Sequence, residues 1–424
     1  MHIGIDLRCL LTPHRTGIGE YTAELLNALF AIDHHNHYYL FYNSYRDVFL
    51  DLPQWEQANV HYVGTCWPNK IFSTVISLTK HPKLDRLIAD YSKKNNFQFP
   101  TTDARPLDYF FSPHLNFTAL TPKTKHILTI HDISFEFFPK FFTPRQRLWH
   151  HLVNPKKQCE RADIILTPSE NTKRDLVDYY KINENKIKVL YPGTNCHFEQ
   201  QREISVQSTE TPRDSSFDVG MTEEKYKIKK KYNLPDNFIL FLGTIEPRKN
   251  IIGLIEAFEI FNIQYPISNT SLVIAGAPGW SNKKVYERAA SSPLRDKIKF
   301  LGFIKPEEKP ALYAAASLFV YPSFYEGFGF PVLEALASGT PVITSNRSSL
   351  PEISQSAAYL VNPNKPHEIA EGIRYLLNHN HNPRNPLEIC VICAQTKNGR
   401  VQAEKFSWNQ TAQEWLRLIK KLTG

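Results

Sequence analysis

Residues 323–342 read SFYEGFGFPVLEALASGTPV, and this stretch says most about the fold. An uncharged apolar run ends at Tyr321, two residues before this stretch begins, and is typical of a buried strand. Two glycines then favour a tight turn, and Pro331 suits the first turn of the helix that the apolar spacing predicts up to Ala337. A second short apolar run begins at Val342. Strand, turn, helix and strand in this order predict parallel α/β construction.

The same alternation of apolar runs and amphipathic helical stretches continues on both sides. It predicts strands at Ile3–Leu7, Tyr38–Tyr42, Asp108–Ser112, His126–Ile130, Asp163–Thr167, Ile187–Leu190, Phe238–Leu242, Leu272–Ala275, Ile298–Leu301, Leu318–Tyr321 and Val342–Thr344. Helical spacing between strands includes Lys249–Phe261. We therefore predict an α/β fold of two doubly wound, Rossmann-like domains that face a crevice. In such sheets ligands bind at the carboxyl ends of the strands.

The alternation stops between Gln200 and Glu224, where Ser, Thr, Asp and Glu dominate without an apolar period. We therefore predict an N-terminal domain over residues 1–195, a linker or insertion over 196–235 and a C-terminal domain over 236–405. Residues 406–424 follow the complete second pattern and repeat apolar side chains at helical spacing. We expect this last segment to form a helix with one apolar face.

Composition narrows the class of protein. The chain has 424 residues, 42% of them hydrophobic and 22% charged, which excludes collagen, a coiled coil and a wholly disordered chain. The uncharged apolar stretch Ala311–Tyr325 is shorter than the ~20 residues of a membrane-spanning helix. Asp6 and Arg8 interrupt what would have to be the apolar core of a signal peptide. We therefore expect a cytoplasmic protein.

Charge and cysteines point to partners rather than to cofactors. The net charge of +8 favours phosphate-bearing partners, but no nucleic-acid motif accompanies the five lysines of residues 225–231. We expect those lysines on a solvated linker or helix face. Cys390 and Cys393 form an isolated CxxC, which we interpret as two core side chains of a helix and not as a metal site.

The sequence GTIEPRKN at residues 243–250 follows a predicted strand and precedes a predicted helix. Arg248 and Lys249 are therefore expected at a helix N-terminus, where exposed backbone N–H groups and the helix dipole favour a phosphate or diphosphate. An exposed basic pair that merely ends a loop is the alternative.

Two glutamates flank the glycine-rich turn. Glu326 is expected on the loop, where it could bond hydroxyls or a developing positive charge. Glu334 is expected one turn into the helix, where it could accept hydrogen bonds from a diol such as ribose. Glutamates eight residues apart are common, so the specificity lies in the surrounding strand, turn, proline and ASGTPV.

Smaller features occur in the first half. Gly17 and Gly19 lie between the first strand and its helix, where backbone can approach phosphate, although a bare GxG is weak evidence. His131 ends a strand and is expected to face the crevice, with a purely structural histidine as the alternative. The chain contains no DxD, GxSxG or P-loop sequence, so protein cations and helix ends would have to stabilise a leaving diphosphate. We expect no metal and no cofactor.

Together these motifs resemble the family-four glycosyltransferases, retaining enzymes with the GT-B fold. The resemblance rests on residues 17–19, 131–132 and 248–250, on the glutamate pair and on the closing FSWNQTAQEW at 406–415. It implies that the first domain is the acceptor side, that the second binds a nucleotide sugar, and that residues 406–424 cross back onto the first. Residues 131–149 look especially like bacterial mannosyltransferases of polysaccharide or lipid-linked glycan synthesis.

The resemblance also implies a role for each site residue. Arg248 and Lys249 would hold the donor diphosphate, and Glu334 would bind the ribose. The transferred sugar would be held by Glu326 and by the backbone of Phe328, Gly329 and Phe330. The base would lie against Phe303 and Ile304. In the first domain, His131 would touch the sugar near the reacting centre, and Gly17 and Gly19 would close on the phosphates.

The implied activity is metal-independent, retaining hexosyl transfer, with mannose moving from GDP-mannose to a glycan or lipid-linked glycan. A GT-B nucleotide-sugar 2-epimerase and a non-catalytic sugar-binding subunit are the alternatives. Phe135, Phe137, Phe138, Phe141 and Phe142 precede two arginines. They are expected either to pack in the core or to meet a lipid-linked acceptor on an anionic membrane. The enzyme would then work in the cytoplasm, either free or on the inner face of the membrane.

Overall fold

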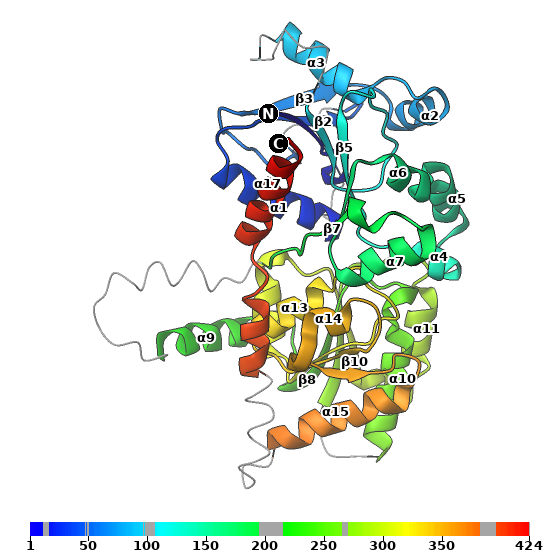
Figure 1. The fold of residues 1–424 in the computed structure, drawn as a ribbon. Coiled ribbons are helices and arrows are strands. Elements are labelled where there is room, and N and C mark those ends of the chain that lie inside the picture. The colour runs from blue at the N-terminus through cyan, green and yellow to red at the C-terminus, as the bar shows by residue number, and fades with distance from the viewer. Residues whose placement is uncertain are drawn as a thin grey trace. The chain divides into compact units, whose positions relative to one another are not determined.

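A computed structural model describes residues 1–11, 17–46, 48, 51–95, 97, 107–194, 215–264, 270–381 and 396–423. The chain divides into two compact units (Figure 1). The first unit comprises Met1–Phe137, Pro144–Gly193 and Ser407–Gly424, and the second comprises Phe138–Thr143 and Thr194–Phe406.

The first unit is built on one parallel sheet. Within the described residues its strand order is β3-β2-β1-β4-β5-β6-β7. At its centre, Ile5 is in register with Leu40 on one side and Phe111 on the other, and all three are fully buried. Both faces are covered, as the unbroken apolar runs require. The strands are β1 (His2–Asp6), β2 (His37–Asn43), β3 (Val60–Thr65), β4 (Tyr109–Ser112), β5 (Lys125–Thr129), β6 (Ile164–Thr167) and β7 (Ile187–Val189).

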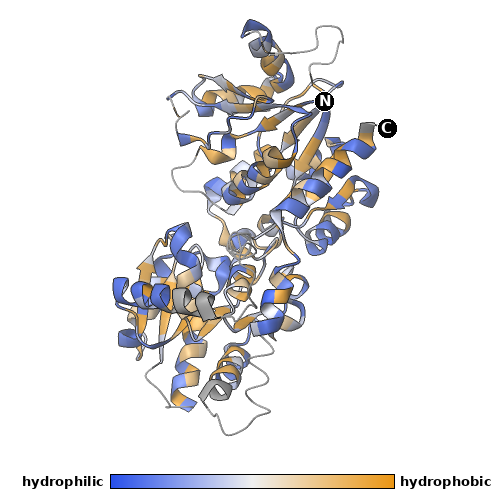
Figure 2. Cartoon of the chain, turned by 90° about the vertical axis from the view of Figure 1, so that its left-hand side faces the viewer, coloured by the Kyte–Doolittle hydropathy of each residue, from blue (hydrophilic) through white to orange (hydrophobic). Residues whose placement is uncertain are grey.

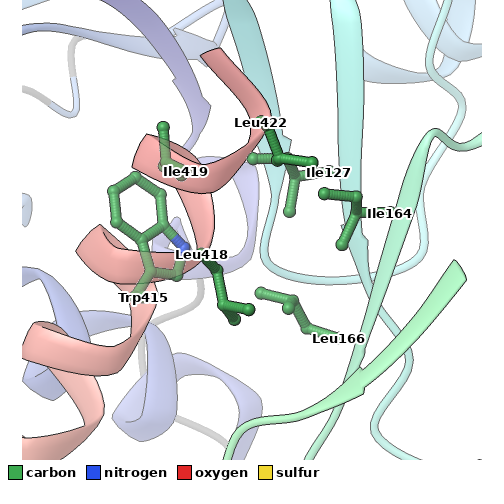
Figure 3. A pocket seen from close by; sticks show the side chains of 7 residues that line it. All are labelled: Ile127, Ile164, Leu166, Trp415, Leu418, Ile419 and Leu422. Atoms are coloured by element: carbon green, nitrogen blue, oxygen red, sulfur yellow. The ribbon is translucent and has the colours of Figure 1, made fainter. Parts of the chain in front are cut away.

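Helices cover this sheet and include the end of the chain. They are α1 (Gly17–Ile32), α2 (Asn69–Thr79), α3 (Leu84–Lys94), α4 (Ser134–Phe137), α5 (Pro144–Val153), α6 (Pro155–Arg161), α7 (Glu170–Tyr180) and α17 (Trp408–Thr423). Helix α17 packs against α1, and its Trp415 meets Phe111 of β4 edge to face. Figure 3 shows a small pocket between α17 and strands β5 and β6 that only apolar side chains line. It is a gap in packing and offers no polar group to a ligand.

The second unit repeats the plan. Its described strands run in the order β10-β9-β8-β11-β12-β13, all parallel. They are β8 (Asn237–Leu242), β9 (Thr270–Ala275), β10 (Ile298–Gly302), β11 (Leu318–Tyr321), β12 (Val342–Ser345) and β13 (Tyr359–Val361). The helices are α9 (Ser215–Lys231), α10 (Ile251–Gln264), α11 (Lys283–Ala290), α12 (Lys309–Ala315), α13 (Phe330–Ala337), α14 (Leu350–Ser354) and α15 (Pro366–His381).

The predicted fold class is confirmed, because both units are doubly wound parallel α/β sheets. Figure 2 shows hydrophobic residues along the strands and mixed character on the helices. Two strands escaped prediction. β3 contains His61, Gly64 and Thr65 and therefore lacks a continuous apolar run, and β13 has only three residues, of which Leu360 is exposed.

The predicted linker is too long. Its end, residues 215–231, forms helix α9, which packs on α12 and places Ile228 in the core of the second unit. Because lysines surround Ile228, this segment has no clear apolar periodicity, and the sequence does not indicate that Ile228 is buried. Lys231 pairs with Glu308 and Lys227 with Glu223, as expected of a solvated helix face. Residues 196–214, Cys390 and Cys393 lie outside the described residues.

Within the described part of the chain, no helix combines the length and the apolar character needed to cross a bilayer.

Candidate active site

The polar cluster of the second unit lies where two neighbouring strands end. Strand β8 leads into a 3-10 turn, Pro247–Lys249, which carries Arg248 and Lys249. Strand β11 leads into the loop that carries Glu326. Because β8 and β11 pair in parallel, their carboxyl ends meet at one edge of the sheet. The structure thus brings these three predicted site residues together.

The carboxylate of Glu326 is the centre of this cluster. Its Oε1 lies 2.7 Å from Lys249 Nζ, and it also accepts hydrogen bonds from Ser323 Oγ at 2.6 Å and Tyr321 OH at 3.1 Å. Its Oε2 accepts one from Arg248 Nη1 at 2.9 Å. Lys249 Nζ in turn donates to Tyr321 OH at 2.6 Å. Every oxygen and cation in the cluster has a partner, as buried charges require.

These cations decide the charge state of Glu326. Burial by itself would raise the pKa of this carboxyl, but the nearby charges of Arg248 and Lys249 outweigh it and hold the pKa at about 2. Arg248 also donates to Glu246 Oε1 at 2.8 Å, so its guanidinium bridges two carboxylates. Glu326 therefore stays ionised at neutral pH and fixes the orientation of both cations, whereas burial lowers the pKa of Lys249.

An exposed basic pair, the alternative to a phosphate site, is contradicted by Arg248, whose side chain is only 14% exposed, and also by Lys249. This residue is only 8% exposed, and helix α10 begins two residues later, at Ile251. Asn250 interrupts the helix with a φ of +56° and donates from its side chain to Pro363 O at 2.6 Å. Lys249 can be buried because β11 and its loop supply the partners that burial demands.

The turn after Glu326 is stabilised by hydrogen bonds from Ser349. Ser349 Oγ lies 2.9 Å from the carbonyl oxygen of Glu326 and 2.7 Å from that of Phe328. Gly329 has a φ of +116°, a conformation that side chains rarely adopt, and α13 begins at the next residue. The ring of Phe328 packs edge to face on Phe330. Packing therefore fixes the backbone that was expected to hold a sugar.

Glu334 has a different set of partners. It lies on α13 and accepts hydrogen bonds from Tyr313 OH at 2.8 Å and Lys309 Nζ at 3.4 Å, both on α12. Its side chain is about one quarter exposed, so a hydroxyl ligand can reach it.

The two residues expected at the base pocket differ in environment. Phe303 follows β10 and is 49% exposed, whereas Ile304 belongs to the hydrophobic core of the second unit. Phe303 is therefore accessible for stacking on a base, whereas Ile304 is not.

In the first unit, His131 lies just beyond the carboxyl end of β5. Its Nε2 donates to the carbonyl oxygen of Pro113 at 2.8 Å, and the ring of Tyr21 meets it edge to face. Burial lowers the pKa of His131, so the imidazole is neutral and its Nδ1 is left as a hydrogen-bond acceptor. Tyr21 comes from α1, which begins at Gly17. Helix α1 therefore carries both Gly17, its first residue, and Tyr21, the residue that contacts His131.

Gly17 and Gly19 were expected between the first strand and its helix, but they lie in the first turn of α1 itself, and their surroundings differ. Gly17 is exposed, and a Cβ added there would meet nothing within 4 Å, whereas Gly19 is buried. Among the residues that the structure describes, no packing contact requires a glycine at position 17, and the open space leaves room for a ligand.

Sequence reasoning missed part of the cluster. Glu246 and Ser323 stand inside the quoted motifs, and their place at strand ends could have suggested them. Tyr321 and Ser349 carried no signal, because they act through contacts with residues far away in sequence. Across the described residues, no group of three or more His, Cys, Asp and Glu side chains could hold a metal ion.

Comparison with known proteins decides the family. Residues 15–198 match the family model described as Glycosyltransferase Family 4, and residues 222–388 match Glycosyl transferases group 1. The O-antigen chain mannosyltransferase B of Escherichia coli is 30% identical over 318 residues, which cover 74% of this chain and 73% of that protein. The chain belongs to the family-four glycosyltransferases. It is a hexosyltransferase, as the motifs predicted.

Other similarities of this glycosyltransferase agree. The serotype-specific mannosyltransferase WbdA of Escherichia coli is 28% identical over 61% of this chain, but the match spans only 29% of WbdA. A sucrose-phosphate synthase structure from Thermosynechococcus elongatus covers 100% of the chain and 99% of its own, with a TM-score of 0.71 at 20% identity. The lipopolysaccharide glycosyltransferase WaaG covers 98% of the chain and 99% of its own, with a TM-score of 0.61 at 15% identity. These likenesses confirm the GT-B fold class.

Proposed function

We propose that this glycosyltransferase moves mannose from GDP-mannose to a glycan or lipid-linked glycan, with retention of configuration and without a metal ion. The observation that carries the proposal is the cluster of Arg248, Lys249 and Glu326 at the carboxyl edge of the second sheet. The likeness to O-antigen mannosyltransferase B supports the choice of sugar.

The cluster suits departure of a diphosphate. Glycosyl transfer passes through an oxocarbenium-like state, and negative charge grows on the leaving group. Arg248 is oriented by two carboxylates and partly exposed, so it can meet that charge without a large rearrangement. Lys249 lies behind it and adds positive charge from a buried position.

The remaining roles follow from position. Glu334 would bind the ribose hydroxyls, Phe303 would stack on the base, and the backbone of residues 328–330 would hold the sugar. His131 would accept a sugar hydroxyl at Nδ1, and Gly17 would leave room for phosphate. Attack from the same face, with the leaving phosphate helping to deprotonate the acceptor, would give retention.

Membrane attachment belongs to the same proposal, but the aromatic cluster does not provide its surface. Only Phe137 of that cluster is exposed. Phe135 stacks on His150, whereas Phe138, Phe141 and Phe142 pack against aromatic side chains of the second unit.

The first unit offers another surface for an anionic bilayer. Helix α5 exposes Leu148, Trp149 and Leu152, and its first turn carries Arg145. Helix α2 exposes Ile71 and Leu78. Burial, followed by the positive charges of Arg161, Lys157 and Lys83, lowers the pKa of Lys80 at the end of α2, so cations gather there. Apolar side chains between cations are typical of proteins that lie on anionic membranes.

Donor turnover tests the proposal directly. The protein should release GDP from GDP-mannose much faster when an acceptor glycan is present, and the anomeric configuration of the product should match that of the donor. A 2-epimerase would convert a donor sugar without any acceptor, and a sugar-binding subunit would release no GDP. Arg248→Ala should lower turnover on the order of 100-fold.

A further inference from the structure

Residues 138–143, FPKFFT, form a segment that we call the strap. The strap lies between α4 and α5, two helices of the first unit, yet its own contacts place it in the second unit. It contains one 3-10 turn, Pro139–Phe141. Its three phenylalanines are half-buried, so they are not core residues.

Two rings of the strap lie on the loop that carries Glu326. Phe141 stacks on Phe324 with ring centroids 5.7 Å apart, and Phe138 packs on Tyr325 at 6.0 Å. The two strap rings also stack on one another, nearly parallel, at 5.3 Å. Contacts of this geometry are favourable for aromatic pairs.

Trp280 fastens the strap from the other side. Its indole Nε1 donates a hydrogen bond to the carbonyl oxygen of Phe141 at 2.6 Å, and its ring stacks on Phe142 at 5.7 Å. Trp280 lies in the loop after β9, so the strap is held by two loops at the same edge of the sheet. This contact fixes the backbone of Phe141 as well as its side chain.

The residues beneath the strap are those that hold Arg248. The amide nitrogen of Phe324 donates to the carbonyl oxygen of Arg248 at 2.9 Å, and Arg248 Nη1 donates to the carbonyl oxygen of Tyr325 at 2.8 Å. Glu326 is the next residue along the chain. A shift of Phe324 or Tyr325 would therefore move both the cation and the carboxylate of the cluster.

We propose that the strap positions the diphosphate-binding cluster, with Phe138 and Phe141 as positioning residues that act through Tyr325 and Phe324. The inference rests on the proposed function of Arg248 at the donor diphosphate. Reacting groups must be held within fractions of an ångström, and small misplacements from remote positions can cost roughly 100-fold in rate. The strap supplies such support from a part of the chain otherwise remote from this site.

The test compares Phe141→Ala with Phe137→Ala. Phe137 is an exposed phenylalanine four residues earlier, whose ring packs on Tyr179 of the first unit instead of on the Glu326 loop. We expect Phe141→Ala to raise the Kd for GDP and to lower kcat with GDP-mannose by roughly tenfold to 100-fold. Phe137→Ala should leave both unchanged. Calorimetry gives the Kd, and GDP release gives kcat.

Two further variants keep the test decisive. Phe141→Tyr retains the aromatic ring, so its Kd for GDP and its kcat should be close to those of the wild type. If Phe141 had only a structural role, Phe141→Ala would lower the melting temperature but leave the kcat of the folded protein unchanged. Equal Kd and kcat in Phe141→Ala and Phe137→Ala would overturn the inference while Arg248→Ala remains defective. If Arg248→Ala itself binds GDP normally, the proposed function of the cluster fails first.

Discussion

Lys249 and Glu326 form a buried ion pair, 2.7 Å from Nζ to Oε1, between residues 77 positions apart in the sequence. Arg248 holds the other carboxylate oxygen, so one glutamate orients both cations. The positive charge proposed to meet the donor diphosphate is therefore preorganised by the fold.

Burial of Lys249 changes what its removal should do. Lys249→Met should destabilise the protein by about 3 kcal/mol, because it removes the buried partner of a buried carboxylate. Arg248→Ala should also destabilise the protein, because it removes a partner of two buried carboxylates, those of Glu246 and Glu326. Urea unfolding followed by fluorescence measures both. The double variant Lys249→Met/Glu326→Gln should lose less than the sum of its parts, and strict additivity would argue against the pair.

Acid should weaken the two units in different pH windows. Burial lowers the pKa of His114 and His126 in the first unit to about 4, so they take up protons more readily when unfolded. Stability of that unit should fall as the pH drops from about 6.5 to 4. The pKa of Glu326 is depressed to about 2, so its contribution is present above pH 4.5 and is lost only as the pH falls towards 2.

Hydrogen exchange across the pH range can separate these windows. His126→Gln should reduce the pH dependence of the first unit between pH 6.5 and 4, whereas Glu326→Gln should not affect that window. Simultaneous loss of protection in both units near pH 6 would contradict the assignment.

Two glycines offer a matched pair. Gly17→Ala should leave stability unchanged or raise it by about 0.5 kcal/mol, because its Cβ meets open space. It should nevertheless raise the Kd for GDP roughly tenfold, equivalent to about 1.4 kcal/mol, if phosphate approaches this backbone. Gly193→Ala should instead destabilise, since its Cβ would lie 2.1 Å from the backbone nitrogen of Trp408. Thermal unfolding and GDP calorimetry of both variants check this contrast.

The proposed membrane surface predicts salt-sensitive binding to vesicles. Wild-type protein should bind vesicles of phosphatidylglycerol, and binding should weaken as salt screens the cations. Leu148→Asp/Leu152→Asp should abolish sedimentation with these vesicles. Ile263→Asp is the control, because Ile263 is an even more exposed apolar residue, on α10 of the second unit. Equal sedimentation of all three proteins would refute this surface.

We predict that sugar transfer by this enzyme does not depend on a metal ion. Because the sequence lacks a DxD motif, GDP release from GDP-mannose should persist in EDTA at close to its original rate. Loss of activity that Mg²⁺ or Mn²⁺ restores would mean that a metal ion, and not Arg248 and Lys249, neutralises the diphosphate.

Local patterns were enough for the architecture and for most of the motifs. Apolar runs of strand length, glycine-rich turns and a proline at a helix start act within about ten residues, so the sequence by itself determined two parallel sheets and put Arg248, Glu326 and His131 at strand ends. The family followed from the same short motifs.

The tertiary structure alone decided which of these groups touch and how deeply they lie. Lys249 is buried because β11, strand neighbour of β8, brings Tyr321 and Glu326 to it, and no local pattern encodes that pairing. The strap, expected in the core or on a membrane surface, lies instead on the loop of Glu326. Side-chain burial depends on contacts between segments that are distant in the sequence. The sequence of an aromatic segment therefore does not indicate which surface it will cover.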